Sequence, residues 1–466
     1  MVLWLAPSCG PMKIKEWLIL LLILGSALRL GFWFIGEPTA FPDTGTYIEV
    51  AKQLVSGDFS NYQGRRTPGY PLLLILAQLS PHAVWIIQML AGLAISMCLF
   101  YMAYELTGKH GFAFLMGMTY NVNLGQLFFE ANLIPETETT LFVTSTAALL
   151  ALIHRRFRDR SSGWILILAG TLAGGAVMAR PQFVFLPMLL GIFIGYGSLI
   201  YARSNWRVAL ARAVIAAGPG IFMILAWSSF NYFHVGHFTL STQTGVGLME
   251  HTIAFAELAP ERYRTVRDVL VKHRDLHLAE TGRYTATWEA LPELKKVTGL
   301  ALPALDKELL KVSTSLIAAH PFRYAALVGD AWVSFWLVSN PKGIEDVKPQ
   351  VLNELLNWSW RFEHPLLRSI NAVFLVFLVV AMLSRRFRQQ TNWGFIFTAV
   401  SAVAVFSSIL QALAVGVDNT RYGVTIQPLV VLIVMTAVYR MWTVRLSLRQ
   451  DRSLSMTGEA SNGGVL

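Results

Sequence analysis

The chain has 466 residues, of which 54% are hydrophobic and only 14% are charged, whereas about 25% of the residues of an ordinary soluble domain are charged. This composition excludes an ordinary soluble enzyme and favours a protein that crosses a membrane several times. The two cysteines, Cys9 and Cys98, lie too far apart in sequence to suggest a disulfide framework or a cysteine-based metal site.

Ten runs of mostly apolar residues are long enough to predict membrane spans, since a spanning helix needs about 20 such residues. An eleventh stretch, residues 324–338, is interpreted as an interfacial or re-entrant helix, because counting it as a span would move the arginines at 385–388 to the other face. The ten predicted spans are Trp17–Ile35, Ala83–Leu106, Phe112–Phe129, Thr139–Ile153, Trp164–Ala179, Phe183–Tyr201, Val214–Phe230, Leu366–Leu383, Trp393–Val415 and Tyr422–Arg440.

The net charge of +10 could suggest a nucleic-acid partner, but its distribution sets orientation instead. With ten spans, all short basic loops fall on the side of the N-terminus, as the positive-inside rule requires. These loops contain Arg155–Arg160, Arg203–Arg212 and Arg385–Arg388. We therefore expect a multi-pass protein of the cytoplasmic (inner) membrane with both termini in the cytoplasm, in contact with membrane lipids and with no nucleic acid.

The same topology predicts the organisation of the chain. Residues 1–230 form an N-terminal transmembrane module with a first outer loop at 36–70, and residues 231–365 form a larger, mostly helical outer segment. Residues 366–441 form the C-terminal spans, and residues 442–466 form a cytoplasmic tail. The first span has no small-residue cleavage site after it, so we expect an uncleaved anchor, with Met1 and Met12 both open as start sites.

The first outer loop contains two candidate functional groups. Asp43 directly follows the first span, and the apolar residues after it have helical spacing, so Asp43 is either a functional carboxylate or the N-cap of a short surface helix. Arg66 and its neighbour Arg65 lie in a segment rich in glycine and proline, where a pair of arginines can bind a phosphate group or lipid headgroups.

Further ionisable groups occur on the same predicted face. Glu130, Glu136 and Glu138 lie in one short loop, and Glu136 can also simply begin a helix after a proline. Arg180 ends the fifth span and Arg421 precedes the last one, where each arginine either extends to lipid headgroups or binds an anion. We interpret the convergence of these groups on one membrane face as the candidate site.

Searches for motifs of soluble enzymes find no phosphate-binding glycine loop, zinc-protease motif or nucleophile elbow. His234, His237 and His251 are scattered in the outer segment, a pattern more typical of solvated loops than of a metal site. No metal site is therefore predicted from these residues.

A larger pattern of residues resembles the C-superfamily (GT-C) membrane glycosyltransferases. The resemblance is strongest to the bacterial group that uses polyprenyl-phosphate sugars and includes protein O-mannosyltransferases, lipid A aminoarabinose transferase and rhizobial core lipopolysaccharide transferases. It is carried by Pro42-Asp43-Thr44-Gly45-Thr46-Tyr47, Arg66-Thr67-Pro68-Gly69-Tyr70-Pro71, Asn132-Leu133-Ile134-Pro135-Glu136-Thr137, Arg180-Pro181, Asn231-Tyr232, His320-Pro321-Phe322 and Arg421-Tyr422. Several branches of the family have an Asp-Glu pair where this chain has Asp43-Thr44.

The resemblance implies a GT-C type bundle of about 10–11 transmembrane helices with interfacial helices in the first outer loop. It also implies inverting transfer of a hexose or pentose from a polyprenyl-phosphate donor to a lipid, glycan or protein acceptor at the outer face of the membrane, as part of cell-envelope glycan biosynthesis. By resemblance Asp43 is the catalytic base, and Glu136 assists it, orients the acceptor or holds a divalent metal ion. Arg66, Arg180 and Arg421 are the candidates for donor phosphate.

The tyrosines that accompany these residues, Tyr47, Tyr70 and Tyr422, are candidates for substrate contacts. The main alternative to a transferase is a transporter or flippase of a lipid-linked or small anionic substrate, in which the same charges would mark a substrate pathway. A non-catalytic scaffold, in which Asp43 would be replaceable, is the third alternative. The missing inverted repeats and the one-sided distribution of charge favour the transferase.

Overall fold

The computed structural model describes residues 12–157, 163–416 and 419–462, with side chains as far as residue 446. Cys9, Arg158 and Arg160 lie outside these ranges, as does the start of the predicted N-terminal module. The described residues fold into helices and contain no strand, apart from an isolated bridge between Thr39 and Asn132. The prediction of an all-α protein is confirmed.

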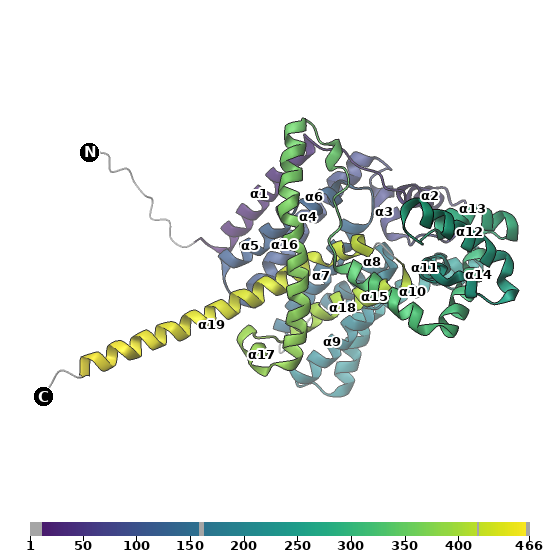
Figure 1. Cartoon of the computed structure of the whole chain (residues 1–466). Coiled ribbons are helices and arrows are strands. Elements are labelled where there is room, and N and C mark those ends of the chain that lie inside the picture. Colours follow the sequence, from purple (N-terminus) through teal and green to yellow (C-terminus); the bar gives the residue numbers. More distant parts are fainter. Residues whose placement is uncertain (1–11, 158–162, 417–418, 463–466) are drawn as a thin grey trace.

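Among the described residues, eleven helices build the main bundle, and most of the shorter helices cover one of its ends (Figure 1). The bundle helices are α1 (Ile14–Trp33), α4 (Pro81–Thr107), α5 (His110–Asn121), α6 (Leu124–Ala131), α7 (Glu136–Arg155), α8 (Gly163–Ala179), α9 (Leu186–Ile200), α10 (Trp206–Val235), α16 (Gln350–Leu383), α18 (Phe395–Ala414) and α19 (Gln427–Asn462). The shorter helices are α2 (Thr44–Ser56), α3 (Gly69–Leu76), α11 (Thr244–Thr252), α12 (Arg264–Thr281), α13 (Thr287–Thr298), α14 (Leu302–Ala319), α15 (Pro321–Trp336) and α17 (Arg385–Thr391).

Seven helical segments of the described chain are long and apolar enough to cross a membrane: Ile14–Trp33, Pro81–Thr107, Pro181–Ile200, Trp206–Val235, Gln350–Leu383, Phe395–Ala414 and Gln427–Leu446. Each corresponds to one of the ten predicted spans. The predicted span at Trp164–Ala179 is the apolar but shorter α8, and the one at Thr139–Ile153 lies in α7, whose first turns are buried and rich in threonine. The chain is thus a multi-pass membrane protein.

The predicted span Phe112–Phe129 is not one continuous helix. α5 ends at Asn121 and α6 begins at Leu124, because the Asn123 side chain accepts a hydrogen bond from the backbone N–H of Gln126 at 2.8 Å and caps the new helix. Asparagine is a preferred N-cap residue because its side-chain oxygen satisfies a free backbone N–H of the first turn. Hydropathy alone misses such a break inside an apolar run.

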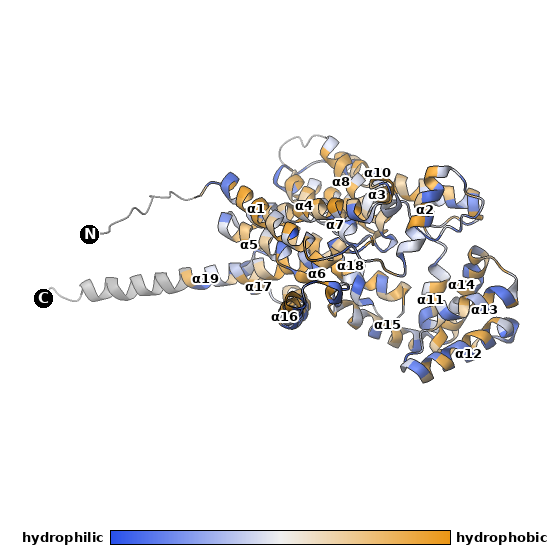
Figure 2. Cartoon of the chain, turned by 90° about the horizontal axis from the view of Figure 1, so that it is seen from above, coloured by the Kyte–Doolittle hydropathy of each residue, from blue (hydrophilic) through white to orange (hydrophobic). Residues whose placement is uncertain are grey.

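The ends of the bundle differ in character. Figures 1 and 2 place α2 and α11–α14 at one end and the start of α1 and α17 at the other. α11–α14 pack around their own apolar core, which includes Val246, Leu270, Leu294 and Leu309. α15 packs on α18, and it is not among the candidate spans. The predicted boundary at 365 falls inside α16, which continues through Pro365.

A buried ion pair ties α1 to α6 inside the bundle. Arg29 contacts both carboxylate oxygens of Glu130, at 2.6 and 2.9 Å, and donates to the Asn121 side chain at 2.9 Å. Gly92 of α4 packs directly against this pair, and a Cβ atom there would overlap both the Glu130 carboxylate and the Arg29 guanidinium. The close approach of α4 therefore requires glycine at this position.

Gly92→Ala is expected to lower the stability of the folded protein by about 3–5 kcal/mol, the usual cost of breaking a buried ion pair. Thermal unfolding in detergent measures the effect. Gly31→Ala is the matched control, because nothing lies within 4 Å of a Cβ at that helical position. Equal melting temperatures for the two variants would contradict the packing described for Gly92.

Candidate active site

The first outer loop presents Asp43 to the site because α2 is amphipathic. Tyr47, Val50 and Ala51 are buried on one face of α2, as their helical spacing predicts. Asp43 occupies the N-cap position of α2, yet its side chain makes no capping hydrogen bond. The carboxylate of Asp43 is turned instead toward two arginines, so the simple capping interpretation does not describe its role.

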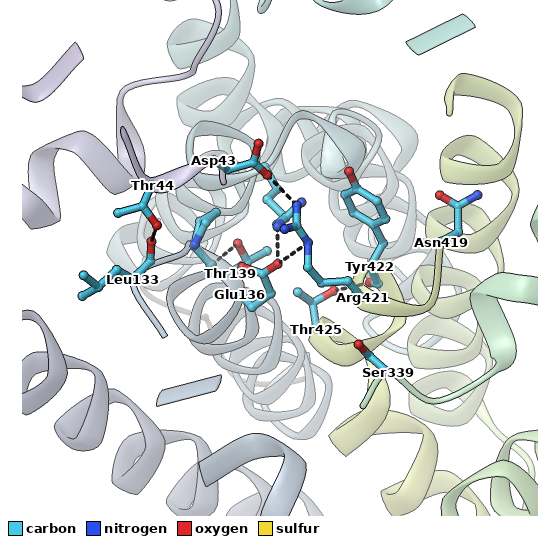
Figure 3. Close-up of polar contacts among 12 residues, drawn as sticks. Asp43, Thr44, Leu133, Glu136, Thr139, Ser339, Asn419, Arg421, Tyr422 and Thr425 are labelled. Atoms are coloured by element: carbon cyan, nitrogen blue, oxygen red, sulfur yellow. Dashed lines mark hydrogen bonds and ion pairs between the residues drawn. The ribbon is translucent and has the colours of Figure 1, made fainter. Parts of the chain in front are cut away.

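Five charged side chains form one continuous network. Asp43 contacts Arg66 through Oδ1 at 2.6 Å and Arg421 through Oδ2 at 2.8 Å. Arg421 also contacts Glu136 at 3.0 Å, and the same Glu136 oxygen pairs with Arg180. Figure 3 shows Arg421 between Asp43 and Glu136. Three arginines alternate with two carboxylates, which leaves one excess positive charge.

Each member of the network comes from a different element. Arg66 lies just before α3, Glu136 is the first residue of α7, Arg180 follows α8, and Arg421 lies in the short 3-10 helix Asn419–Thr425. The Glu136 and Arg180 side chains are 0% and 8% exposed, whereas the Asp43 side chain is 31% exposed. The buried pair therefore forms the floor of the site, and Asp43 lies at its accessible edge.

Aromatic rings hold the arginines in place. The Arg66 guanidinium lies 4.5 Å from the ring centre of Tyr47 and donates to the Tyr47 hydroxyl at 3.4 Å, while the Arg180 guanidinium lies 4.8 Å from the ring of Tyr422. Cation–π contacts of this kind favour a fixed arginine position. Tyr70 is fully buried behind Tyr47, with the ring centres 5.2 Å apart, and it supports the site without lining the cavity.

An open cavity of about 290 Å³ adjoins the network. Its wall includes Tyr47, Arg66, Arg180 and Tyr422 of the predicted site. Further polar wall residues are Arg65 and Thr67, which belong to the segment noted in the sequence, and Gln182, Ser241, Gln243, Thr244 and Gln411, which the sequence did not indicate. No carboxylate belongs to the wall among the residues that the structure describes, so the cavity presents positive and neutral polar groups together with apolar residues such as Val184 and Leu410.

The first outer loop and the outer segment meet at this cavity. Ser241 donates to the carbonyl of Arg65 at 2.8 Å, the N–H of Thr242 donates to the carbonyl of Gly64 at 2.9 Å, and Tyr62 donates to the Asn231 side chain at 2.6 Å. Gly64 has a positive φ of 67°, a conformation that favours glycine. These contacts fix the approach to the cavity.

The other predicted acidic residues lie elsewhere. Glu130 is buried in its pair with Arg29, so it belongs to the bundle and not to a solvated loop. Glu138 is 8% exposed, lies beside an apolar groove along α3, α4 and α8, and forms no ion pair within the described residues. Asp418, three residues before Arg421 in sequence, lies outside the described ranges.

Guanidinium groups contact both carboxylate oxygens of Asp43 and one carboxylate oxygen of Glu136. The other Glu136 oxygen, Oε2, is buried without a hydrogen-bond partner. No group of three or more potential ligands occurs in the described chain. His234 donates through Nδ1 to the carbonyl of Phe230 in its own helix, and the buried His251 donates through Nε2 to the carbonyl of Ala412.

Burial by itself would raise the pKa of the Asp43 carboxyl, but the charges and hydrogen bonds of Arg66 and Arg421 outweigh it and hold the pKa well below its ordinary value. A depressed folded-state pKa means that this carboxylate stabilises the fold fully above its ordinary pKa of about 4. The stabilisation is lost as the pH falls below that value.

The difference in melting temperature between the wild type and Asp43→Asn is therefore expected to stay constant from pH 7 to about pH 5 and to shrink below pH 4. Thermal unfolding across this pH range measures it. A difference that grows on acidification would contradict the pairing of ionised Asp43 with the two arginines.

No protein-family model matches the sequence, and no curated protein matches it. Solved structures do match. The apo oligosaccharyltransferase of Archaeoglobus fulgidus is 14% identical, with a TM-score of 0.50 over 95% of this chain and 52% of its own. The same organism's AglB, in complex with an inhibitory peptide and a dolichol-phosphate, gives a TM-score of 0.49 at 12% identity over the same shares.

ArnT from Cupriavidus metallidurans, bound to undecaprenyl phosphate, is 12% identical, with a TM-score of 0.37 over 91% of this chain and 78% of its own. The match to the archaeal oligosaccharyltransferase covers 52% of that protein, so this chain spans about half of its length. At such identities the similarity concerns the fold. The chain shares its all-helical, multi-pass fold with the matched half of the archaeal oligosaccharyltransferase, in agreement with the all-α membrane bundle predicted from the sequence.

Proposed function

We propose that the protein is an inverting membrane glycosyltransferase that moves a sugar from a polyprenyl-phosphate donor to a lipid, glycan or protein acceptor. The observation that carries the proposal is the network of three arginines and two carboxylates beside the open cavity. Its single excess positive charge matches the one negative charge of a sugar phosphodiester. The GT-C fold supports a transferase in general.

In the proposed reaction, Asp43 accepts the proton of the acceptor hydroxyl. The acceptor oxygen then bonds to the anomeric carbon, and the bond from that carbon to the phosphate oxygen breaks. Attack from the face opposite the phosphate inverts the anomeric centre. The polyprenyl phosphate leaves with one additional negative charge, and because a phosphate monoester is a good leaving group, no strong general acid is needed.

The arginines act on the charge that develops on the leaving phosphate. Preorganised cations at such a position typically contribute several kcal/mol to transition-state stabilisation. Arg66 and Arg180 line the cavity, and Arg421 connects them through Asp43 and Glu136. Glu136, held between Arg180 and Arg421, orients these two guanidinium groups.

Ion pairing also controls the base. While Arg66 and Arg421 hold the pKa of Asp43 low, its carboxylate is a weak base. A donor phosphate that binds the same guanidinium groups competes with Asp43 for their hydrogen bonds. Donor binding would therefore raise the basicity of Asp43 at the moment when an acceptor can react.

The outer face of the cytoplasmic membrane is the proposed location of the reaction. The basic segment α17 lies at the end of the bundle opposite α2 (Figure 1), and short basic segments stay in the cytoplasm. Both termini are then cytoplasmic, and the segment that includes Ser241 and Thr242 covers the cavity from outside and selects the acceptor.

Mass spectrometry of envelope glycans and glycolipids, from cells with and without the gene, tests the proposal. One sugar is expected to disappear without the gene, to return with the wild-type gene, and to stay absent with Asp43→Asn. Accumulation of a lipid-linked sugar on the inner leaflet, with no activity of the purified protein in transfer, would indicate a flippase instead.

A further inference from the structure

The cavity contains one cation that the proposed reaction does not use. Arg65 lines the cavity beside Arg66, but its guanidinium forms no ion pair and no hydrogen bond with any residue that the structure describes. Its Nε atom is buried without a partner. Glu49 and Asp43 attract Arg65 only at longer range.

Arg65 and Arg66 differ in the contacts of their side chains. Adjacent in sequence, the two arginines differ completely in their contacts: Arg66 contacts Asp43 at 2.6 Å, Thr46 at 2.8 Å and the ring of Tyr47. Arg65 is fixed only through its backbone, whose carbonyl accepts from Ser241. A partly buried guanidinium without an anion is costly, so the arrangement favours a ligand that supplies the missing charge.

Two other wall residues also have unsatisfied polar atoms. The Gln182 side chain donates to Ser407 at 2.8 Å while its Oε1 is buried without a partner. The Nε2 of Gln243 is likewise buried without a partner. Side-chain amides offer both a donor and an acceptor and suit the hydroxyl groups of a sugar.

We propose that Arg65 forms a second anion subsite, an inference that rests on the proposed function. The subsite binds a carboxylate or phosphate group of the substrate that is separate from the donor phosphate. The five-membered network already balances the donor phosphodiester, so the charge of Arg65 is left for another group. The source of this group is either an acidic transferred sugar or an acidic acceptor.

Arg65→Gln and Arg66→Gln, in the full-length protein in nanodiscs, separate the two subsites. The first probe is a short-chain polyprenyl phosphate without sugar. Arg66→Gln is expected to weaken its binding at least tenfold, whereas Arg65→Gln changes it less than twofold. Equal weakening by both variants would assign Arg65 to the donor phosphate and overturn the inference.

The second probes are the same lipid phosphate carrying glucose or glucuronic acid. If the transferred sugar is acidic, the wild type binds the glucuronic acid donor at least tenfold more tightly, and Arg65→Gln removes this preference. If the acceptor is acidic, neither form discriminates between the donors, but Arg65→Gln loses at least tenfold in transfer to the acceptor in native membrane vesicles.

Unchanged binding of every probe together with unchanged transfer in Arg65→Gln would contradict the second subsite. A different result would contradict the proposed function itself, namely that the wild type binds no polyprenyl phosphate at all. Arg65→Gln is expected to unfold at the wild-type temperature or slightly above it, because the Arg65 guanidinium makes no hydrogen bond or ion pair within the described residues and its unpaired charge is costly.

Discussion

Asp43→Asn is expected to lower the rate of sugar transfer by about 10²–10⁴-fold, the usual contribution of a general base. Asparagine keeps the size of the side chain but cannot accept the proton of the acceptor hydroxyl. The measurement is transfer by the purified variant at saturating donor, so that a weaker interaction with the lipid does not limit the rate.

Asp58→Asn is the matched control for this prediction. Asp58 belongs to the same outer loop and is exposed, with its carboxylate accepting from the backbone N–H of Ser60 at 2.9 Å. This variant is expected to keep wild-type transfer, and both variants should insert and accumulate normally. Full transfer by Asp43→Asn would remove Asp43 from the role of base.

Glu136→Gln is expected to destabilise the folded protein by about 3–5 kcal/mol and to reduce transfer strongly. The Glu136 side chain is fully buried and is shared by Arg180 and Arg421. Removal of its charge leaves two mostly buried guanidinium groups with less compensation, which is the costly way to break a buried ion pair. Thermal unfolding and transfer rates measure the two effects.

Glu138→Gln provides a sharp comparison, because Glu138 belongs to the same helical turn and is also buried. No ion pair of Glu138 occurs within the described residues, and its Oε2 has no hydrogen-bond partner. Replacement of a buried carboxyl group that has no charged partner by a neutral amide is expected to be neutral or stabilising. A larger loss of stability in Glu138→Gln than in Glu136→Gln would contradict the proposed distribution of charge.

Hydropathy was sufficient to predict most of the bundle, because spanning helices must be long and apolar in any fold. It could not predict the end of α5, where one Asn123 side chain caps a new helix. It also missed the pair of Arg29 with Glu130, since a charge inside a span reveals its partner only after the helices have packed.

The sequence predicted the membrane face on which the candidate site lies, but not which side chains contact one another there. Topology placed Asp43, Glu136, Arg180 and Arg421 on one face, and the structure brings them into one network. The family pattern selects Arg66, but it does not show that only Arg66 of the two adjacent arginines reaches Asp43, because this difference arises from the fold. Tyr70 matched the family pattern equally well, but burial keeps it behind the cavity wall.

The central claim is that the arginine and carboxylate network serves transfer from a lipid phosphate donor. Its most direct test is a transfer assay with the purified wild-type protein, a membrane extract as the source of acceptor, and either polyprenyl-phosphate sugars or nucleotide sugars as the donor. The proposal predicts transfer from a polyprenyl-phosphate sugar and none from nucleotide sugars alone. Transfer from a nucleotide sugar without the lipid carrier would contradict it.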